Sequence, residues 1–150
     1  MKHLIAGVVM AVASMLPVAA ADFMTDVVDP YLRVQTALVN DDLAPVGPAA
    51  RAVQQAASAL GADGTALSAA AGKAARATTL EAARLAFGDL SAALIAYVDK
   101  TRVPVDGAIV AYCPMVAKSW VQPAGAIANP YYGKAMATCG ESKRKLSVTQ

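Results

Sequence analysis

Four sulfur-bearing side chains near the C-terminal end of this 150-residue sequence could do chemistry together: Cys113, Met115, Met136 and Cys139. Two thiolates and two thioethers form a soft ligand set, which selects Cu(I) and, less often, Ag(I) over hard or borderline ions. A thioether sulfur also needs no deprotonation before it binds a metal. The residue types therefore indicate a site for a soft monovalent ion, provided that Cys113 and Met115 come close to Met136 and Cys139 in the folded chain.

The local sequence around these residues suggests how they could converge. Pro114 disfavours helical backbone at Cys113, so this cysteine is expected in extended or turn geometry. Residues 129–139 begin with Asn-Pro and are followed by glycine, a pattern that predicts a short helix. Met136 and Cys139 are three residues apart and would share one face of that helix. If this face meets the Cys113 turn, each side contributes two sulfurs.

A disulfide between Cys113 and Cys139 is the alternative interpretation of the same residues. Two cysteines in a secreted chain usually form a disulfide. Closing a loop of about 27 residues would stabilise the fold by roughly 3 to 4 kcal/mol in the chain-entropy model. Met115 and Met136 would then fill gaps in the core and contact aromatic rings. The sequence leaves both interpretations open.

Composition excludes several other classes of protein. The chain is 57% hydrophobic and 16% charged, which is not the composition of a disordered protein. A net charge of +2 gives no clustered basic face for nucleic acid. The single histidine, His3, lies in a segment expected to be removed, so Ser-His and Cys-His catalysis and imidazole-bound zinc are excluded. Because the sequence also contains no acid–base pair or cofactor loop, we expect no enzyme.

The first 21 residues have the pattern of a secretory signal peptide. A short basic start at residues 1–3 precedes the apolar run 4–18, and small residues at 18–21 supply a cleavage site. The apolar run is shorter than the roughly 20 residues that a membrane-spanning helix needs. We therefore expect a mature chain of residues 22–150 in the periplasm or outside the cell, with no stable membrane insertion.

Residues 25–100 are rich in alanine and have helical periodicity. Four helices are predicted, from Asp29-Pro30 to about residue 40, from Pro45 or Pro48 to Gly61, from Thr65 to about residue 77, and from a capping box at Thr78 and Glu81 to Lys100. The predicted fold is all-α, an up-and-down helical bundle of about four helices in one domain over 22–150. A Cys/Met-containing turn-and-helix segment follows at 104–141, after an apolar and extended stretch at 108–112, and a basic tail covers 142–150.

Three aromatic residues could line the sulfur site: Tyr112, Trp120 and Tyr132. The ring face of Trp120 could cap a bound Cu(I) through a cation–π interaction. Packing in the core is the other interpretation for Trp120 and Tyr132.

The pattern of these residues also resembles a known family. The resemblance covers nearly the whole mature chain and is carried by Tyr31-Leu32, Leu38, Asp41-Asp42, Cys113-Pro114-Met115, Trp120, Asn129-Pro130-Tyr131-Tyr132-Gly133, Met136 and Cys139-Gly140. The family is a periplasmic or secreted domain of unknown function. It occurs alone and at the C-terminus of membrane-fusion adaptors of heavy-metal (copper and silver) efflux systems.

Two departures from related motifs concern histidine. Members of the family often carry a histidine just before the Cys-Pro-Met cysteine, where this chain has Tyr112. Residues 112–115 are also similar to the start of the Y-x-C-P-M-H-P motif of some metal transporters, without the intervening residue and without the following histidine. The resemblance therefore implies a helical bundle with a metal-linked role in the periplasm, and leaves a sulfur-only site.

Two hypotheses of different classes follow from the sequence. The first is a secreted protein that binds Cu(I) for copper tolerance, buffering or handover. The second is a disulfide-stapled interaction module without metal, whose partner is a protein such as an efflux component.

The N-terminal pattern gives the first testable prediction. Because signal peptidase cleaves after small residues, the mature protein should begin at Ala21 or Asp22 and be recovered in the soluble periplasmic fraction. N-terminal sequencing or intact mass checks this. Membrane-bound protein that retains Met1 would contradict it.

Overall fold

The computed structural model describes residues 22–146 and contains four α-helices and one three-stranded sheet. The helices are α1 (Asp29–Val39), α2 (Val46–Ser58), α3 (Thr65–Ala75) and α4 (Leu80–Thr101). The strands are β1 (Ala108–Cys113), β2 (Lys118–Pro123) and β3 (Glu141–Lys145). Short helical turns lie at η1 (Met24–Val28), η2 (Gly61–Gly64) and η3 (Gly133–Met136). Within residues 22–146, none of the helices has the length and apolarity that crossing a bilayer requires.

The four predicted helices are present, with small differences at their ends. The π-helical turn η1 runs directly into α1, so this helix does not begin afresh at Asp29. The N-cap of α4 is Thr79, whose hydroxyl accepts a hydrogen bond from the Ala82 amide at 3.1 Å, and not Thr78. Thr79 has extended backbone, as an N-cap residue should. The helix therefore begins one residue later than the predicted capping box places it.

The prediction of an all-α fold is wrong, because the C-terminal third of the described chain forms an antiparallel sheet. The strand order is β2-β1-β3, and Ala108 to Cys113 pair with Pro123 to Lys118 across a hairpin. β3 pairs with the other edge of β1 through a bulge between Val110 and Ala111. The helix predicted for 129–139 is reduced to the single turn η3, since Gly133 adopts a φ of +56°. Residues 142–145 of the predicted tail belong to strand β3, which begins at Glu141.

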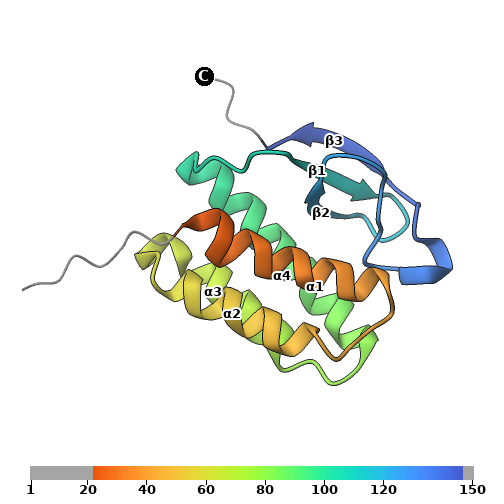
Figure 1. The fold of residues 1–150 in the computed structure, drawn as a ribbon, viewed down its shortest axis with the longest axis horizontal. Helices are drawn as coiled ribbons and strands as arrows, with labels where there is room; N and C mark the ends of the chain where they lie inside the picture. The colour runs from red at the N-terminus through yellow and green to blue at the C-terminus, as the bar shows by residue number, and fades with distance from the viewer. Residues whose placement is uncertain (1–21, 147–150) are drawn as a thin grey trace, which may run out of the picture.

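The sheet lies against one side of the helical layer. Figure 1 shows it over α1 and α4, with α2 and α3 on the far side of those helices, and β2 contacts both α1 and α4. Aromatic side chains fill the space between the layers: Tyr31 stacks on Phe87 with ring centroids 5.1 Å apart, and Trp120 meets Tyr131 edge-on at 5.8 Å. Each such ring buries far more apolar area than an alanine side chain can.

One buried hydroxyl attaches the sheet to the helices. The Tyr31 hydroxyl on α1 accepts a hydrogen bond from the Val121 amide of β2 at 2.9 Å and is hydrogen-bonded to the Ser91 hydroxyl of α4 at 2.7 Å. Tyr31 is fully buried, and burial raises the pKa of its phenol far above the ordinary value, so the hydroxyl stays neutral. Three elements therefore share one polar contact inside the core.

Removing this hydroxyl gives the second prediction. Tyr31→Phe leaves the Val121 amide and the Ser91 hydroxyl without their partner in the core, which should cost about 1–3 kcal/mol of unfolding free energy. Tyr97→Phe is the matched control, because the half-buried Tyr97 ring keeps its stacking on Phe23. Urea denaturation of both variants measures the difference. Equal stability of the two variants would show that the Tyr31 hydroxyl does not anchor the sheet.

Candidate thiol site

Cys113 lies at the end of β1, where the chain turns into β2. Because Cys113 pairs with Lys118, four residues form the hairpin loop, and Pro114 is the first of them. The backbone N–H groups of Met115 and Val116 fold back and donate to the Cys113 sulfur. The thiol is fully buried. The loop therefore surrounds this sulfur with hydrogen-bond donors supplied by its own backbone.

Cys139 reaches the same place from the other side of the sheet. Its amide donates to the carbonyl of Met136 at 3.1 Å, closing the turn that follows η3. Two residues later the chain enters β3, where Glu141 pairs with Tyr112 next to Cys113. The two sulfurs are hydrogen-bonded to each other, and both residues are free thiols. The structure thus brings together the two cysteines that the sequence singled out.

Gly140 permits this close approach. Its φ is +139°, and a Cβ at this position would lie 2.8 Å from the Trp120 ring and 3.0 Å from the carbonyl oxygen of Tyr112. A side chain would therefore push the Cys139 turn away from β1. The glycine that was predicted to end a helix instead lets the backbone pass over the tryptophan.

The two thiols differ in their protonation. Burial raises the pKa of Cys113, but the hydrogen bonds from Val116, Asn129, Met115 and the Cys139 thiol outweigh burial, and the net shift is downward. Burial and the hydrogen bond to Cys113 raise the pKa of Cys139. The first proton therefore leaves Cys113, and the remaining thiol of Cys139 donates to the resulting thiolate.

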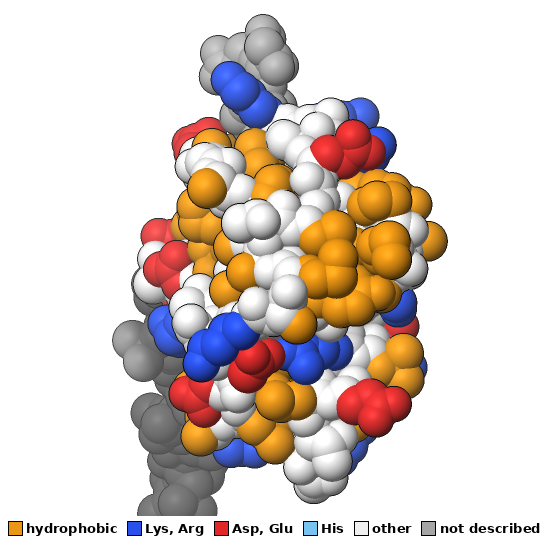
Figure 2. Space-filling view, turned by 90° about the vertical axis from the view of Figure 1, so that its right-hand side faces the viewer, with side chains coloured by type: hydrophobic (Ala, Val, Ile, Leu, Met, Phe, Trp, Pro, Cys, Tyr) orange, Lys and Arg blue, Asp and Glu red, His pale blue; other side chains and the backbone are white. Residues whose placement is uncertain are grey.

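The thioethers are not buried with the thiols. The Met115 side chain in the hairpin loop is 63% exposed, and that of Met136 in η3 is 39% exposed. Figure 2 views the end of the molecule that carries η3 and shows hydrophobic side chains gathered beside a band of basic and acidic ones. The two thiols therefore form the inner part of the candidate site. Met115, beside Cys113, and Met136, beside Cys139, lie at the surface.

The three aromatic candidates take different positions. Trp120 is fully buried, and its indole N–H donates to the Gln122 amide oxygen at 3.0 Å, so it is a core residue. The Lys143 ammonium lies 5.0 Å from the centre of the Tyr112 ring, on the strand beside the thiols. Tyr132 is half-buried at the edge of the core. Among residues 22–146, no three His, Cys, Asp or Glu side chains come together as metal ligands would.

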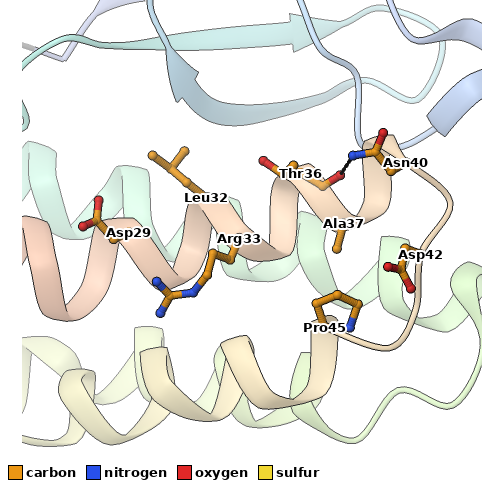
Figure 3. A pocket seen from close by; sticks show the side chains of 8 residues that line it. All are labelled: Asp29, Leu32, Arg33, Thr36, Ala37, Asn40, Asp42 and Pro45. Atoms are coloured by element: carbon orange, nitrogen blue, oxygen red, sulfur yellow. Dashed lines mark hydrogen bonds between the residues drawn. The ribbon is translucent and has the colours of Figure 1, made fainter.

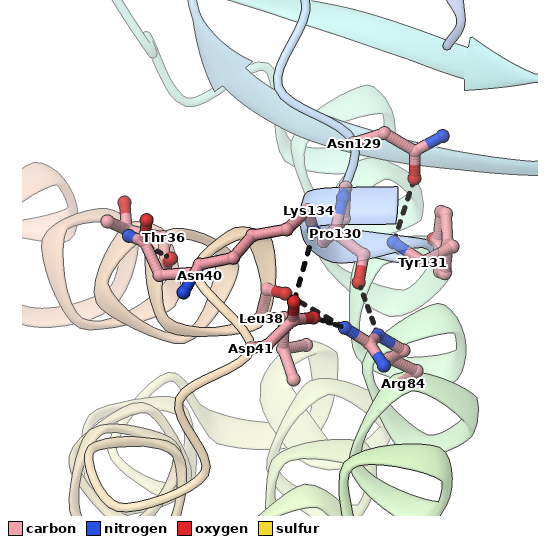
Figure 4. A network of polar contacts seen from close by, with 9 residues as sticks. All are labelled: Thr36, Leu38, Asn40, Asp41, Arg84, Asn129, Pro130, Tyr131 and Lys134. Carbon is pink, nitrogen blue, oxygen red and sulfur yellow. Dashed lines mark hydrogen bonds and ion pairs between the residues drawn. The ribbon is translucent and has the colours of Figure 1, made fainter. Parts of the chain in front are cut away.

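A polar network holds the loop before Cys139 against the helices (Figure 4). The Arg84 guanidinium of α4 pairs with the Asp41 carboxylate and donates to the carbonyl oxygens of Leu38 at 3.2 Å and Pro130 at 3.1 Å. The Lys134 amide donates to the other Asp41 oxygen at 3.2 Å. The hydrogen bond from Arg84 lowers the pKa of the Asp41 carboxyl below its ordinary value. Burial opposes this shift, and the hydrogen bond from the Lys134 amide adds to it.

Sequence reasoning missed the donors that surround the sulfur of Cys113. The sequence predicts Asn129 as a helix N-cap, and its side chain does accept a hydrogen bond from the Tyr131 amide at 2.8 Å. Its amide group, however, faces the two cysteines. The Cys-Pro-Met triplet also predicts a turn, but only the folded hairpin shows that the amides of Met115 and Val116 converge on the thiol.

A surface groove lies elsewhere, along α1 and the connection from α1 to α2 (Figure 3). Polar and charged side chains ring it, and its lining contains none of the four sulfurs; the residues are Asp29, Leu32, Arg33, Thr36, Ala37, Asn40, Asp42 and Pro45. We therefore treat the thiol pair, and not this groove, as the candidate functional site.

Fold and site together define a small domain in which a four-helix layer supports a three-stranded sheet with two adjoining thiols at one end of β1. A family model described as "Protein of unknown function (DUF3347)" matches residues 27–105, and the chain belongs to that family. The matched residues cover the helices and end before β1. Comparisons with curated proteins and with solved structures gave no match.

The Asp41 carboxylate gives the third prediction. Because its pKa is lowered in the folded protein, its contribution to stability is complete above the unfolded value near 4 and is lost as the pH falls through the lower folded value. Asp41→Asn should therefore reduce the loss of stability between about pH 5 and pH 2. Asparagine also tolerates the φ of +57° at this position.

Asp63→Asn is the control for this experiment, because it removes an exposed ion pair with Lys100 instead. Such exposed pairs contribute little. Urea denaturation at a series of pH values compares the three proteins. An acid dependence of Asp41→Asn equal to that of the wild type would contradict the role assigned to the Asp41 carboxylate.

Proposed function

We propose that this protein binds Cu(I) through the sulfurs of Cys113 and Cys139, and that it does so in the periplasm or outside the cell for copper tolerance, buffering or handover. The observation that carries the proposal is the direct contact between two free thiols supplied by separate segments. Cu(I) favours thiolate ligands, and two thiolates can provide most of its coordination. Ag(I) is the other ion that this ligand set suits.

The surroundings of Cys113 favour metal binding. A thiolate must form before it can bind a cation, and three N–H donors around this sulfur stabilise the anion. A monovalent ion between two thiolates also removes part of the repulsion between them. The site therefore has an anionic ligand on the buried side and a half-exposed ligand, Cys139, on the side from which an ion would arrive.

Met115 and Met136 are proposed as supplementary ligands. Each belongs to the same turn as one cysteine, because the Met115 amide donates to Cys113 and the Met136 carbonyl accepts from Cys139. Their exposure allows their side chains to rotate toward or away from an ion at the thiols. Such mobile thioethers suit the capture and release of Cu(I) more than its permanent retention.

The proposed location rests on the signal-like segment at residues 1–21, which lies outside the described residues. The proposed partner is a component of a copper or silver efflux system. This proposal rests on the resemblance of the Cys-Pro-Met and Asn-Pro-Tyr-Tyr-Gly motifs to those of the domain that occurs at the C-terminus of heavy-metal efflux adaptors. Both motifs lie beyond the residues that the family model matches. We propose a binding protein and not an enzyme.

A disulfide-stapled interaction module is the second candidate, favoured by the same contact between the sulfurs. In an oxidising compartment two adjoining thiols can form a bond, and the product would have no thiolate for a metal. The oxidised protein would be two mass units lighter and would not react with an alkylating reagent. Its role would then be to bind a protein partner through its surface.

Copper retention gives the fourth prediction. The reduced protein should take up about one Cu(I), and Cys113→Ser or Cys139→Ser should weaken its retention against a competing chelator by tenfold or more. Met115→Leu and Met136→Leu should have smaller effects, because a neutral, exposed ligand contributes less than a thiolate. These leucine changes roughly conserve volume and should leave the fold intact. Titration with bicinchoninate measures each protein.

Met24→Leu is the matched control, since Met24 lies in η1 and packs at the edge of the core. It should retain Cu(I) as the wild type does. If the reduced wild type takes up no Cu(I), the copper proposal is wrong. The disulfide module then becomes the better account. Its own test is that Cys113→Ser and Cys139→Ser, which cannot form the disulfide, melt at a lower temperature than the oxidised wild type.

A further inference from the structure

Asn129 is a buried polar residue whose side chain interacts with both cysteines. Its side chain is fully buried, although asparagine is a residue type that is mostly exposed. The side-chain oxygen accepts from the Tyr131 amide at 2.8 Å, as Figure 4 shows, and the backbone amide donates to the Ala137 carbonyl at 2.7 Å. Replacing this side chain would leave its buried hydrogen-bond partners unsatisfied, which destabilises the fold.

The side-chain NH2 group connects the two thiol-bearing segments. It donates to the carbonyl oxygen of Cys139 at 2.7 Å and also to the sulfur of Cys113. The two hydrogens of one amide group can satisfy two acceptors. One side chain thus contacts both halves of the site, at the sulfur of one cysteine and at the backbone of the other.

This connection matters because few hydrogen bonds reach Cys139 itself: its amide is bonded to the Met136 carbonyl, and its carbonyl accepts from Asn129. The stretch between β2 and β3 contains only the short turn η3, and regular pairing with β1 resumes at Glu141. The sulfur of Cys139 can therefore be placed accurately only through local hydrogen bonds. Residues that orient metal ligands in this way commonly change metal affinity by about 10- to 100-fold when mutated.

We propose that Asn129 is the positioning residue of the thiol site, whose amide holds the sulfurs of Cys113 and Cys139 at the separation needed to bind one soft ion. This inference rests on the proposed function for the identity of the ion. The positioning itself can be measured without metal. It extends the site from the sulfur ligands to the group that sets their geometry.

Asn129→Asp tests the proposal because it replaces the NH2 donor by oxygen and keeps both the shape and the acceptor for Tyr131. Gln122→Glu is the matched control. The Gln122 amide is also buried, and it donates to the carbonyl of Ala126 at 2.8 Å while its oxygen accepts from the Ala128 amide at 3.0 Å. It therefore supports the same loop without touching either cysteine.

The first measurement is the equilibrium of each purified protein with reduced and oxidised glutathione. Each protein disulfide that forms converts one oxidised glutathione into two reduced molecules, with the two thiol protons passing to them. The equilibrium constant reports how often the two sulfurs meet. We expect a decrease of tenfold or more in Asn129→Asp and a change of less than about twofold in Gln122→Glu. A constant for Asn129→Asp within twofold of the wild type, or an equal decrease in Gln122→Glu, would overturn the proposal.

The second measurement is Cu(I) retention against bicinchoninate, with the same expected order. If the wild type binds Cu(I) and Asn129→Asp binds it equally well, the proposal fails. If the wild type binds none, the proposed function fails, and the glutathione result alone decides the role of Asn129.

Asn129→Ser is the second variant if the buried carboxylate of Asn129→Asp prevents folding. Serine can still accept from the Tyr131 amide but is too short to reach both cysteines. In the wild type, NMR provides a further readout, because disulfide formation or Cu(I) binding should shift the side-chain amide signals of Asn129 and leave those of Gln122 in place. An unchanged Asn129 signal in both cases would overturn the proposal.

Discussion

The antiparallel pairing of β1 with β3 is the constraint on which the candidate site depends. Cys113 and Cys139 are 26 positions apart in sequence and would have no reason to meet in an extended chain. The pairing of Tyr112 with Glu141 returns the chain to the end of β1, and the missing side chain at Gly140 lets it approach closely. Backbone hydrogen bonds therefore bring the two cysteines to the same end of β1. Local hydrogen bonds such as that of Asn129 then set the positions of their sulfurs.

The network around Arg84 extends this constraint into the helices. Arg84 contacts the end of α1 and the Pro130 carbonyl at once, so the loop before Cys139 is attached to the same helices that support the sheet. Gly133 lies against the Asp41–Arg84 pair with a φ of +56°, which a larger residue would adopt only with strain. The Asn-Pro-Tyr-Tyr-Gly motif thus supplies a buried amide at Asn129, an acceptor for Arg84 at Pro130 and the turn at Gly133 that follows them.

The helical part of the fold could be predicted because alanine-rich periodic segments and capping residues are local signals. The sheet could not, because only β1 carries a local signal, the apolar and extended stretch at residues 108–112. β3 is the sequence Glu-Ser-Lys-Arg-Lys, and all five side chains are exposed, so no alternation marks it as a strand. β1 is the central, buried strand, and its backbone N–H and C=O groups need hydrogen-bond partners on both sides. Residues 141–145 are extended because they supply the partners on one of those sides.

The site was predictable as a set of residues and only partly as a geometry. Cysteine is rare enough in this chain for its two positions to stand out, and the turn at Pro114 has a local cause. The helix expected to align Met136 with Cys139 ends after one turn, so the shared helical face was the wrong reason for their proximity. The role of Asn129 depends on contacts across the fold, which residue type and spacing do not contain.

The two outer edges of the sheet are protected in different ways. On β2, the outward-facing amide of Val121 is occupied by the Tyr31 hydroxyl, and the strand lies against α4. On β3, Lys143, Arg144 and Lys145 are all exposed, and Arg144 pairs with Asp99 of α4. A strand from another molecule that added to β3 would have to bring its backbone alongside this row of charges. The strand that completes the thiol site is thereby also made a poor template for aggregation.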